Sequence, residues 1–157
     1  MNHHDDRPHW QLAQPSHDFE IVELCLALFA EDPGLFAVTE QMILNTLVAY
    51  RQQPVRGRAV VLHALMKAVG YAFLAVFWSN ELGGEVCVID ELYVKPEYRS
   101  RGHGKKLFEQ LQHDREFLPQ QFVALDLEVT PKNSRAQKLY SCLGFEAATN
   151  THFRLLL

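Results

Sequence analysis

The sequence predicts an α/β domain in which helices flank a mixed β-sheet. Two observations support this prediction. Two helical patterns precede three consecutive strand patterns, and a strand, a helix and a further strand then follow one another. The strand–helix–strand unit runs from Ile89 to Val129, and such a unit places its two strands parallel. The three strands from Arg58 to Val94 should form an antiparallel meander.

Length and composition bound the possible classes of protein. A chain of 157 residues, 48% of them apolar, can bury one core. We therefore expect a single domain over residues 1–157, with residues 1–8 as a loose polar end. The formal net charge of −4 argues against a nucleic-acid partner, which needs a basic face. No apolar run is long enough to span a bilayer, so no membrane partner is expected.

Cysteine usage points to a reducing compartment. The three cysteines, Cys25, Cys87 and Cys142, lie far apart in apolar stretches and form no C-x-x-C pair. We expect them to be buried free thiols in the cytoplasm. The paired histidines at the start could bind a metal, but a frayed terminus explains them better, and no metal site is predicted.

The first two expected elements are helices. Residues 17–34 place apolar side chains on one face at helical spacing, and "DPG" should end this helix. That apolar face consists of Ile21, Leu24, Cys25 and Leu28. Ser16 or Asp18 can cap its start. Residues 39–50 form the second helix, with Thr39 as its N-cap.

The meander is marked by β-branched and aromatic residues. Its expected strands are "RAVVLHAL" (58–65), "AVGYAFLAVFWS" (68–79) and "EVCVIDELYV" (85–94), and "NELGG" forms a turn.

The second half alternates helices and strands. Leu107, Phe108 and Leu111 mark a helix that runs to about Phe117. In residues 122–130 an apolar face, Val123, Leu125, Leu127 and Val129, alternates with Ala124, Asp126 and Glu128. Residues 133–144 form a helix, in which Asn133 can cap the start and Gly144 can end it in a left-handed conformation. Residues 145–157 should form one or two final strands.

A glycine-rich turn joins the end of the meander to the following helix. The stretch "YVKPEYRSRGHGKKLF" holds five cations: Lys95, Arg99, Arg101, Lys105 and Lys106. Free N–H groups at a helix start, the helix dipole and small glycines together favour a phosphate or diphosphate. A solvated turn with surface lysines is the alternative. Two common phosphate motifs are absent, G-x-x-x-x-G-K-[ST] and the full G-x-G-x-x-G, because Leu107 follows Gly104 by three residues.

Two motifs resemble the GNAT acetyltransferase superfamily. Within "LYVKPEYRSRGHGKKLFEQL", Arg99, Gly102 and Gly104 match the acetyl-coenzyme A pattern Gln/Arg-x-x-Gly-x-Gly/Ala. The segment "NSRAQKLYSCLGF" is similar to a second signature of the family. The residues that match this second signature are Asn133, Ala136, Leu139, Tyr140, Gly144 and Phe145. The resemblance covers about residues 69–145, and "IDELYV" resembles the corresponding strand of small polyamine and diamine acetyltransferases.

The resemblance implies a fold and a co-substrate. The twisted sheet should be mostly antiparallel, with two central parallel strands that splay apart, and acetyl-CoA should bind between them. The implied coenzyme contacts are Leu92, Tyr93 and Val94 on the pantetheine arm, Arg99, Ser100, Arg101, Gly102, His103, Gly104 and Lys105 on the diphosphate, and Asn133 and Ala136 on the last helix. Asn133 could contact the arm, brace the strands or only cap the helix.

Tyr140 is the implied general acid. When an amine attacks the thioester, coenzyme A leaves as a thiolate, and a phenol near the sulfur can protonate it. Spacing alone favours another role, in which Tyr140 completes the apolar stripe of its helix. The resemblance favours the catalytic role.

The acceptor amine must lose a proton, since primary amines have a pKa near ~10. A carboxylate can accept that proton and attract the cation. Asp90 and Glu91 are candidates. Neighbours on a strand point to opposite faces unless a bulge intervenes, so only one of them should face the acyl group. Asp126 and Glu128 share a face and could line an acceptor pocket or lie at the surface.

Aromatic and histidine side chains are weaker candidates. Trp78, with Phe77 and Tyr71, could wall the acceptor pocket, although aromatic residues in a meander are more often core. His103 should act through its backbone, and His63 resembles a hydrogen-bonded interior residue.

These patterns predict an N-acetyltransferase that moves an acetyl group from acetyl-CoA to a primary amine in a ternary complex. A small cationic amine is the expected acceptor. An aminoglycoside, an amino acid or a protein N-terminus remains an alternative acceptor. A non-catalytic acyl-CoA-binding module and a generic phosphate binder are alternative functions. The apolar "RLLL" at the end could join a homodimer interface or finish the sheet.

Overall fold

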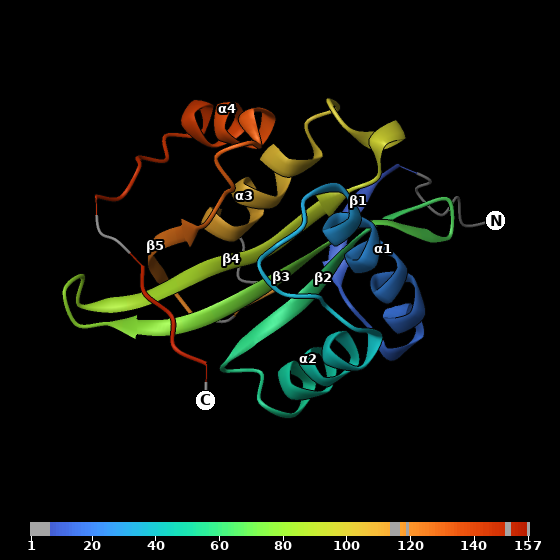
Figure 1. Ribbon diagram of the computed structural model, residues 1–157, viewed down its shortest axis with the longest axis horizontal. Coiled ribbons are helices and arrows are strands. Elements are labelled where there is room, and N and C mark those ends of the chain that lie inside the picture. Colours follow the sequence, from blue (N-terminus) through green and yellow to red (C-terminus); the bar gives the residue numbers. More distant parts are fainter. Residues whose placement is uncertain (1–6, 114–116, 119, 150–151, 157) are drawn as a thin grey trace.

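A five-stranded β-sheet forms the centre of the computed structural model (Figure 1), which describes residues 7–113, 117–118, 120–149 and 152–156. The strands lie in chain order, β1 to β4 antiparallel and β5 parallel to β4. Their bounds are His9–Leu12 (β1), Gly57–Ala64 (β2), Lys67–Ser79 (β3), Gly84–Val94 (β4) and Phe122–Leu127 (β5). The expected mixed sheet, antiparallel meander and parallel strand pair are confirmed.

Helices cover both faces of the sheet, α1 and α2 on one and α3 and α4 on the other (Figure 1). In the described part of the chain they are α1 (Asp18–Glu31), α2 (Glu40–Gln52), α3 (His103–His113) and α4 (Ser134–Cys142), with short 3-10 turns η1 (Pro15–His17) and η2 (Pro96–Tyr98). None of the described helices has the length and apolar character needed to cross a membrane.

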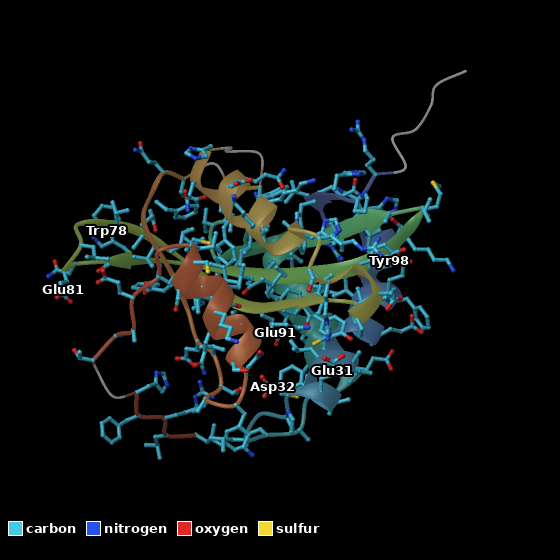
Figure 2. All side chains as sticks on the ribbon, turned by 90° about the horizontal axis from the view of Figure 1, so that it is seen from above. Glu31, Asp32, Trp78, Glu81, Glu91 and Tyr98 are labelled. Carbon is cyan, nitrogen blue, oxygen red and sulfur yellow. The ribbon has the colours of Figure 1, made fainter. Side chains whose placement is uncertain are left out.

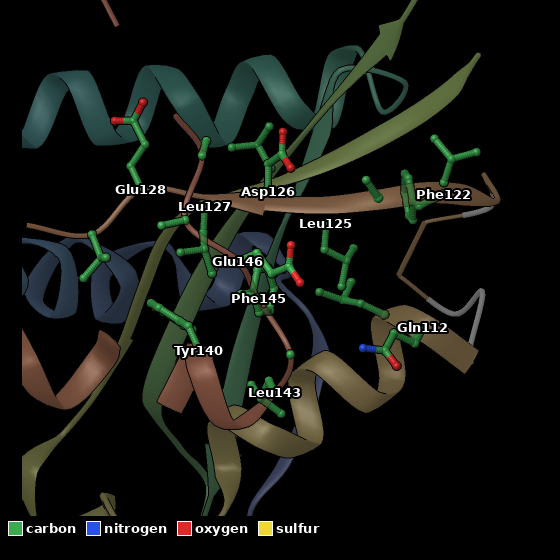
Figure 3. Close-up of a pocket in the computed structure, with 18 of the residues that line it drawn as sticks. Gln112, Phe122, Leu125, Asp126, Leu127, Glu128, Tyr140, Leu143, Phe145 and Glu146 are labelled. Atoms are coloured by element: carbon green, nitrogen blue, oxygen red, sulfur yellow. The ribbon is translucent and has the colours of Figure 1, made fainter. Parts of the chain in front are cut away.

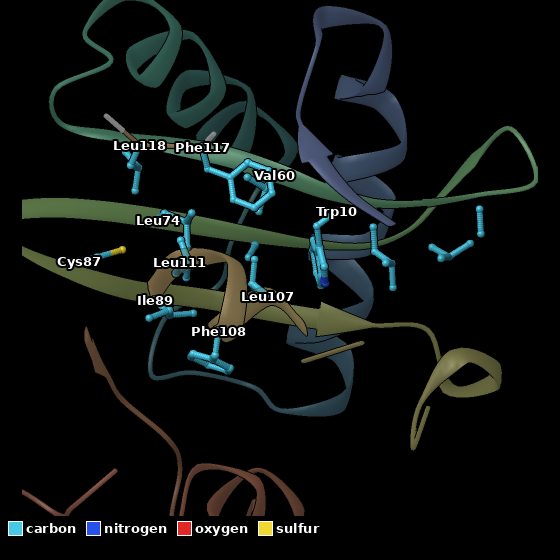
Figure 4. Close-up of a cluster of buried hydrophobic side chains, with 14 residues drawn as sticks. Trp10, Val60, Leu74, Cys87, Ile89, Leu107, Phe108, Leu111, Phe117 and Leu118 are labelled. Carbon is cyan, nitrogen blue, oxygen red and sulfur yellow. The ribbon is translucent and has the colours of Figure 1, made fainter. Parts of the chain in front are cut away.

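Each face of the sheet has its own hydrophobic core. On one face, Leu107, Phe108 and Leu111 of α3 pack on Leu74 and on other apolar residues of the strands (Figure 4). The second core packs the buried faces of α1 and α2 against β2, β3 and β4. Each fully buried Leu or Phe contributes about 1.5–3 kcal/mol through burial, so the two cores fix the helices on the sheet.

Local capping signals are confirmed. The side chain of Thr39 accepts a hydrogen bond from the Met42 amide at 3.3 Å, and Asn133 accepts one from the Ala136 amide at 3.1 Å. Gly144 follows α4 with a φ of 88°, the left-handed conformation that favours glycine. Helix α1 ends at Glu31, before the expected "DPG".

Several expectations about the elements are wrong. Strand β1 was not predicted, because it depends on partners far away in the sequence. It pairs with β2, and the Trp10 indole donates to the His103 carbonyl at 2.8 Å. His17, without a side-chain cap bond, precedes α1 in place of Ser16 or Asp18. Helix α3 ends at His113, and Phe117 lies outside it, while residues 114–116 fall outside the described part. Cys142 is exposed, unlike the buried Cys25 and Cys87.

The end of the chain also differs from the expectation. Strand β5 stops at Leu127, and residues 145–149 and 152–156 form no strand; residues 150, 151 and 157 lie outside the described part. Phe153 in this segment is 89% exposed. The register opposes Glu85 to Phe122 and Val86 to Ala124. This leaves Val123 as an extra residue, 53% exposed, outside the expected apolar face.

Candidate active site

The turn between β4 and α3 exposes the start of a helix. Ser100 and Gly102 have φ values of 61° and 80°, which fold the chain back before α3 begins at His103. The amide of Lys106 donates to the Gly102 carbonyl at 3.0 Å and makes the first helical bond. The preceding amides of the helix have no acceptor among the described residues. Such free amides, with the helix dipole, suit an anion.

The two glycines of the motif have different environments. A β-carbon on Gly102 would meet no atom within 4 Å, so this position is open to a ligand and is kept as glycine by its positive φ. A β-carbon on Gly104 would lie 3.2 Å from the Leu139 side chain. Gly104 therefore allows α4 to pack closely on α3.

The cations of the turn are not equally available. The Arg99 guanidinium lies against protein: Nε donates to the Val94 carbonyl at 2.6 Å, and Nη2 donates to Glu31 at 2.8 and 2.9 Å. It also lies over the Tyr93 ring, 5.1 Å from the ring centroid. Arg101 is exposed and lies over the Tyr98 ring, 5.7 Å from its centroid. Lys105 pairs with Glu109 at the surface at 3.6 Å, and such a pair is weak. Arg101 and Lys105 are the more available of these cations.

His103 contributes its backbone to the turn. Its side chain is 7% exposed, and neither ring nitrogen has a hydrogen-bond partner among the described residues. Burial lowers the pKa of this imidazole, and Lys106 and Arg101 act in the same direction. The neutral ring is therefore favoured, and the free His103 amide remains the group that faces an anion.

A β-bulge places both acids of "IDELYV" on the face covered by α1 and α2. The register opposes Phe73 to Glu91 and Leu74 to Ile89, so Asp90 is an extra residue in β4. Ile89 belongs to the core under α3, and by alternation Asp90 points to the opposite face. After the bulge, Glu91 also points to that face, where it contacts the second core. The sequence predicted opposite faces for Asp90 and Glu91 unless a bulge intervened. The bulge is present, so both acids lie on one face.

Glu91 is held by two buried donors. The Tyr71 hydroxyl donates to Oε2 at 2.7 Å, and the Cys25 thiol donates to the same oxygen at 3.4 Å. Both donor residues are fully buried. Burial raises the pKa of Glu91, and the hydrogen bonds from Tyr71 and Cys25 partly oppose that rise. Oε1 has no hydrogen bond among the described residues, so it can accept from a ligand or a water molecule.

Glu128 lies close enough to Asp90 to affect its pKa. Desolvation raises the pKa of Asp90, the Glu128 charge adds to the rise, and Arg154 opposes it. Glu128 itself contacts His152 at 3.7 Å. On α2, burial raises the pKa of Tyr50 to about 12, with contributions from Asp90 and Glu91. The contributions to the pKa of Tyr50 agree with the placement of Asp90 and Glu91 on the α2 side that the register gives.

Strands β4 and β5 part beside these acids. Their parallel pairing runs from Glu85 opposite Phe122 to Ile89 opposite Leu127. β4 then continues to Val94, paired only with β3 among the described residues. We call this region, residues 90–94 of β4 and residues 128–133 after β5, the strand separation. It leaves the outer backbone of Leu92–Val94 available to a ligand that extends the sheet.

Tyr140 lies on the opposite side of β5 from the acids. Figure 3 shows Asp126 and Glu128 on one side of the strand and Tyr140 on the other, around an open cavity of about 1550 Å³. The Tyr140 ring packs edge-on against Phe108 and Phe145 at 5.9 and 5.8 Å, and burial raises its pKa. The phenol therefore remains protonated at neutral pH, as a proton donor must be.

Asn133 and Ala136 lie at the start of α4, beside the strand separation. Asn133 caps the helix through Oδ1, and its Nδ2 reaches Asp32 at 3.5 Å. Its side chain thus links α4 to α1 as well as capping the helix.

Trp78 is not brought together with the other candidates. It pairs with Glu85, and Glu91 lies six residues along β4 from there, about 20 Å at about 3.3 Å per residue. Figure 2 shows Trp78 well separated from Glu91. Both Trp78 and Phe77 are exposed, at 64% and 48%, and Tyr71 is fully buried. His63 packs near the rings of His9 and His17, at 5.9 and 5.8 Å.

Sequence reasoning missed three parts of the site. It allowed for a bulge in this strand but did not place it at Asp90, and it did not identify the contacts of Cys25 and Tyr71 with Glu91 or the acids at the end of α1. Their contacts join residues 20 to 101 positions apart, and no local pattern shows such pairs. The only usable signal was the helix stop "DPG", which places the α1 end near a loop.

A mixed sheet with a glycine turn at a helix start defines an anion-binding α/β domain. The chain matches the model of the acetyltransferase (GNAT) family over residues 29–145. It therefore belongs to the GNAT family and is an acetyl-CoA-dependent N-acetyltransferase. No curated protein matches the chain.

Solved structures share the fold. A possible acetyltransferase from Clostridium difficile 630 is 21% identical, with a TM-score of 0.77, and the match covers 96% of this chain and 98% of that one. A ribosomal-protein-alanine N-acetyltransferase from Brucella melitensis biovar Abortus 2308 is 17% identical, with a TM-score of 0.74 and coverage of 96% and 99%. An aminoglycoside N-acetyltransferase in complex with CoA is 20% identical, with a TM-score of 0.72 and coverage of 96% and 95%.

Proposed function

We propose that residues 1–157 act as one acetyltransferase domain that acetylates a small cationic primary amine by direct attack in a ternary complex. The bulge at Asp90 supports this proposal most strongly. It gathers two carboxylates on one face, immediately beside the strand separation. An amine held by these acids would reach a thioester placed between β4 and β5.

The coenzyme would bind along the strand separation and the glycine turn. Its diphosphate would accept hydrogen bonds from the free amides of residues 100–105, with Arg101 and Lys105 as countercharges. The pantetheine arm would pair with the backbone of Leu92–Val94. An N–H group of this segment would stabilise the oxyanion that forms on the thioester carbonyl. Asn133 and Ala136 would border the arm from α4.

Glu91 would take the proton from the amine. The ammonium first gives one proton to Oε1 of Glu91, directly or through water. Its nitrogen then forms a bond to the carbonyl carbon, the carbon–sulfur bond breaks, and the second nitrogen proton passes through water to the Tyr140 oxygen. Tyr140 gives its proton to the departing thiolate. The raised pKa of Glu91 brings this carboxylate nearer to the amine in basicity. Asp90 would bind the protonated amine beside Glu91.

A cationic acceptor is supported by the charge around Glu91. Asp90, Asp126 and Glu128 lie on the same side of the sheet. A polyamine or diamine would place one amine at the thioester and a second cation near Asp126 or Glu128.

Thiol release from acetyl-CoA tests the proposal. The panel should contain polyamines, diamines, an aminoglycoside, amino acids and a peptide with N-terminal alanine. We expect the diamines and polyamines to be acetylated fastest, and Glu91→Gln to slow turnover by about 10²-fold or more. Coenzyme binding without thiol release from any amine would instead indicate a binding module. ATP that competes well with acetyl-CoA would indicate a generic phosphate site.

A further inference from the structure

We propose that the end of α1 sets the width of the strand separation. Glu31, the last residue of α1, holds the β4 side, and Asp32, the residue that follows, holds the β5 side. Figure 2 shows both acids together at the end of the helix, near Glu91. This inference depends on the proposed function, because it makes Glu31 and Asp32 positioning residues for the coenzyme.

Glu31 binds both the end of β4 and the turn that follows it. The Tyr93 hydroxyl donates to Oε1 at 2.8 Å, and Arg99 Nη2 donates to both carboxylate oxygens at 2.9 and 2.8 Å. Burial opposes ionisation of Glu31, but the hydrogen bonds from Arg99 and Tyr93 outweigh it and lower its pKa. Glu31 is therefore ionised at neutral pH. Because Arg99 also binds the Val94 carbonyl, Glu31 fixes the start of the glycine turn.

Asp32 binds the other side of the strand separation. The Thr130 hydroxyl contacts both of its carboxylate oxygens, at 3.0 and 2.9 Å, and Asn133 Nδ2 contacts Oδ2 at 3.5 Å. Thr130 follows β5, and Asn133 caps α4. Asp32 therefore fixes the segment that would border the pantetheine arm.

These contacts join two sides that are not otherwise hydrogen-bonded to each other. Among the described residues, no hydrogen bond connects residues 90–94 with residues 128–133. Glu31 and Asp32 are consecutive, so their Cα atoms lie about 3.8 Å apart. Helix α1 is itself fixed by Ile21, Val22, Leu24 and Cys25, which are all buried. One rigid helix end thus sets the distance between the two sides.

Loss of either acid should change that distance and weaken coenzyme binding. Without Asp32, residues 128–133 lose their only hydrogen bonds to α1 in the described part of the chain and can move toward β4 or away from it. Without the Glu31 charge, Arg99 loses its ionic partner and the turn loosens. In either variant, part of the free energy of coenzyme binding would be spent on restoring the distance between residues 90–94 and residues 128–133.

The test compares Asp32→Ala and Glu31→Gln with Asp18→Asn as a matched control. Asp18 begins the same helix and pairs with Arg51 of α2, so Asp18→Asn removes the charge of an ion pair away from the strand separation, as Glu31→Gln does beside it. We expect the Kd of acetyl-CoA, measured by calorimetry, to rise about tenfold in the first two variants. The control should keep the wild-type Kd even where its melting temperature falls equally. The KM of the amine should change less than the KM of acetyl-CoA.

Two further variants separate positioning from a general loss of stability. Asp32→Asn keeps an oxygen that can accept from Thr130, so it should restore much of the affinity lost in Asp32→Ala. Thr130→Val removes the donor at constant shape. The double variant Asp32→Ala/Thr130→Val should then bind no more weakly than Asp32→Ala alone, since both changes remove the same contact.

The outcomes distinguish this inference from the proposed function. A wild-type chain that binds no acetyl-CoA would overturn both. A wild type that binds and turns over, with Asp32→Ala and Glu31→Gln equal to it, would overturn only the role of the α1 end. Equal losses of affinity in these variants and in Asp18→Asn would also overturn that role, because they would reflect stability alone.

Discussion

Two buried side chains that a ligand would not contact affect the ionisation of Glu91. Tyr71 and Cys25 are fully buried, and both donate to one oxygen of its carboxylate. Burial raises the pKa of the Cys25 thiol to about 12 and also raises the pKa of Tyr71, so both groups keep their protons at neutral pH. They can therefore only donate, and their donation stabilises the ionised form of Glu91 that a base requires.

Tyr71→Phe should move the acid limb of the pH–rate profile to higher pH. Burial already raises the pKa of Glu91, and the Tyr71 hydrogen bond partly offsets this rise. Removal of the hydroxyl raises the pKa further, so a larger share of Glu91 is protonated at a given pH. The profile of kcat/KM, measured by thiol release, checks this. An unchanged limb in Tyr71→Phe would mean that Glu91 is not the base.

The raised pKa of Glu91 also makes the stability of the fold depend on pH. Because the pKa of Glu91 is raised in the folded state, its contribution to stability is fully present at pH values below the ordinary carboxyl range. That contribution is lost as pH rises through the folded-state pKa. Glu91→Gln, which can accept both hydrogen bonds, should therefore melt at or above the wild-type temperature at neutral pH while its turnover falls.

Tyr140→Phe should lower turnover with little change in coenzyme affinity. The ring packs against Phe108 and Phe145, and phenylalanine keeps those contacts. Only the proton for the thiolate is lost, a contribution of about 10²-fold or more. Single-turnover rates and the Kd of acetyl-CoA should be measured on the same preparation. A collapse of affinity with normal turnover of the bound complex would disprove the role as general acid.

The residues of the candidate site were chosen from local motifs and, for Tyr140, from the family resemblance, and their roles stay predictions. The side-chain direction of Arg99 does not follow from a local motif, because its partner Glu31 lies 68 positions away. The relative direction of Asp90 and Glu91 depends on a bulge, which forms only once β3 and β4 pair. Tertiary pairing, which leaves no local pattern, decided these points.

At the scale of elements, the glycine turn and α3 act together as the anion site. The turn presents free amides only because Gly102 takes a φ of 80° and has open space beside it. A residue that tolerates a left-handed conformation can be placed there without rebuilding the turn, and asparagine and aspartate are two such residues.

Gly102→Asp should abolish coenzyme binding, whereas Gly102→Asn should weaken it only modestly. The two side chains have the same shape and differ in charge. At about 4 Å and an effective dielectric of about 20, two like charges repel by about 4 kcal/mol. The Kd of acetyl-CoA should therefore rise at least about 100-fold more in the aspartate variant. Equal Kd values in both variants would show that the diphosphate does not bind at this turn.

Element prediction succeeded where local forces dominate. The stripe of α3 and the caps Thr39 and Asn133 depend on neighbours within one turn, whereas the alternation expected for β5 fails at Val123, where the pairing with β4 shifts. Strand β1 is four residues long and exists because Trp10 is buried by distant partners. The final segment shows the opposite case. One or two strands were expected there, but Phe153 and Leu155 are exposed, and no strand forms in its described residues.

At the scale of the whole molecule, charge is separated around the strand separation. The chain carries a net charge of −4, which disfavours an anionic coenzyme. Five cations nevertheless concentrate in the turn after β4 and in the first turn of α3, whereas Asp90, Asp126 and Glu128 lie on the α2 side of the sheet. The two substrates of the proposed reaction have opposite charges, and each would meet its countercharge on its own side.

Salt should therefore weaken the binding of a polycationic acceptor more than that of a monoamine. The Debye length falls from about 10 Å at 0.1 M to about 3 Å at 1 M, which screens Asp126 and Glu128 from a second cation. We expect the KM of a triamine, measured by thiol release at saturating acetyl-CoA, to rise severalfold more steeply with sodium chloride than the KM of a monoamine of similar length. Parallel salt dependence for the two amines would show that only one cation is recognised and that Asp126 and Glu128 do not contact the acceptor.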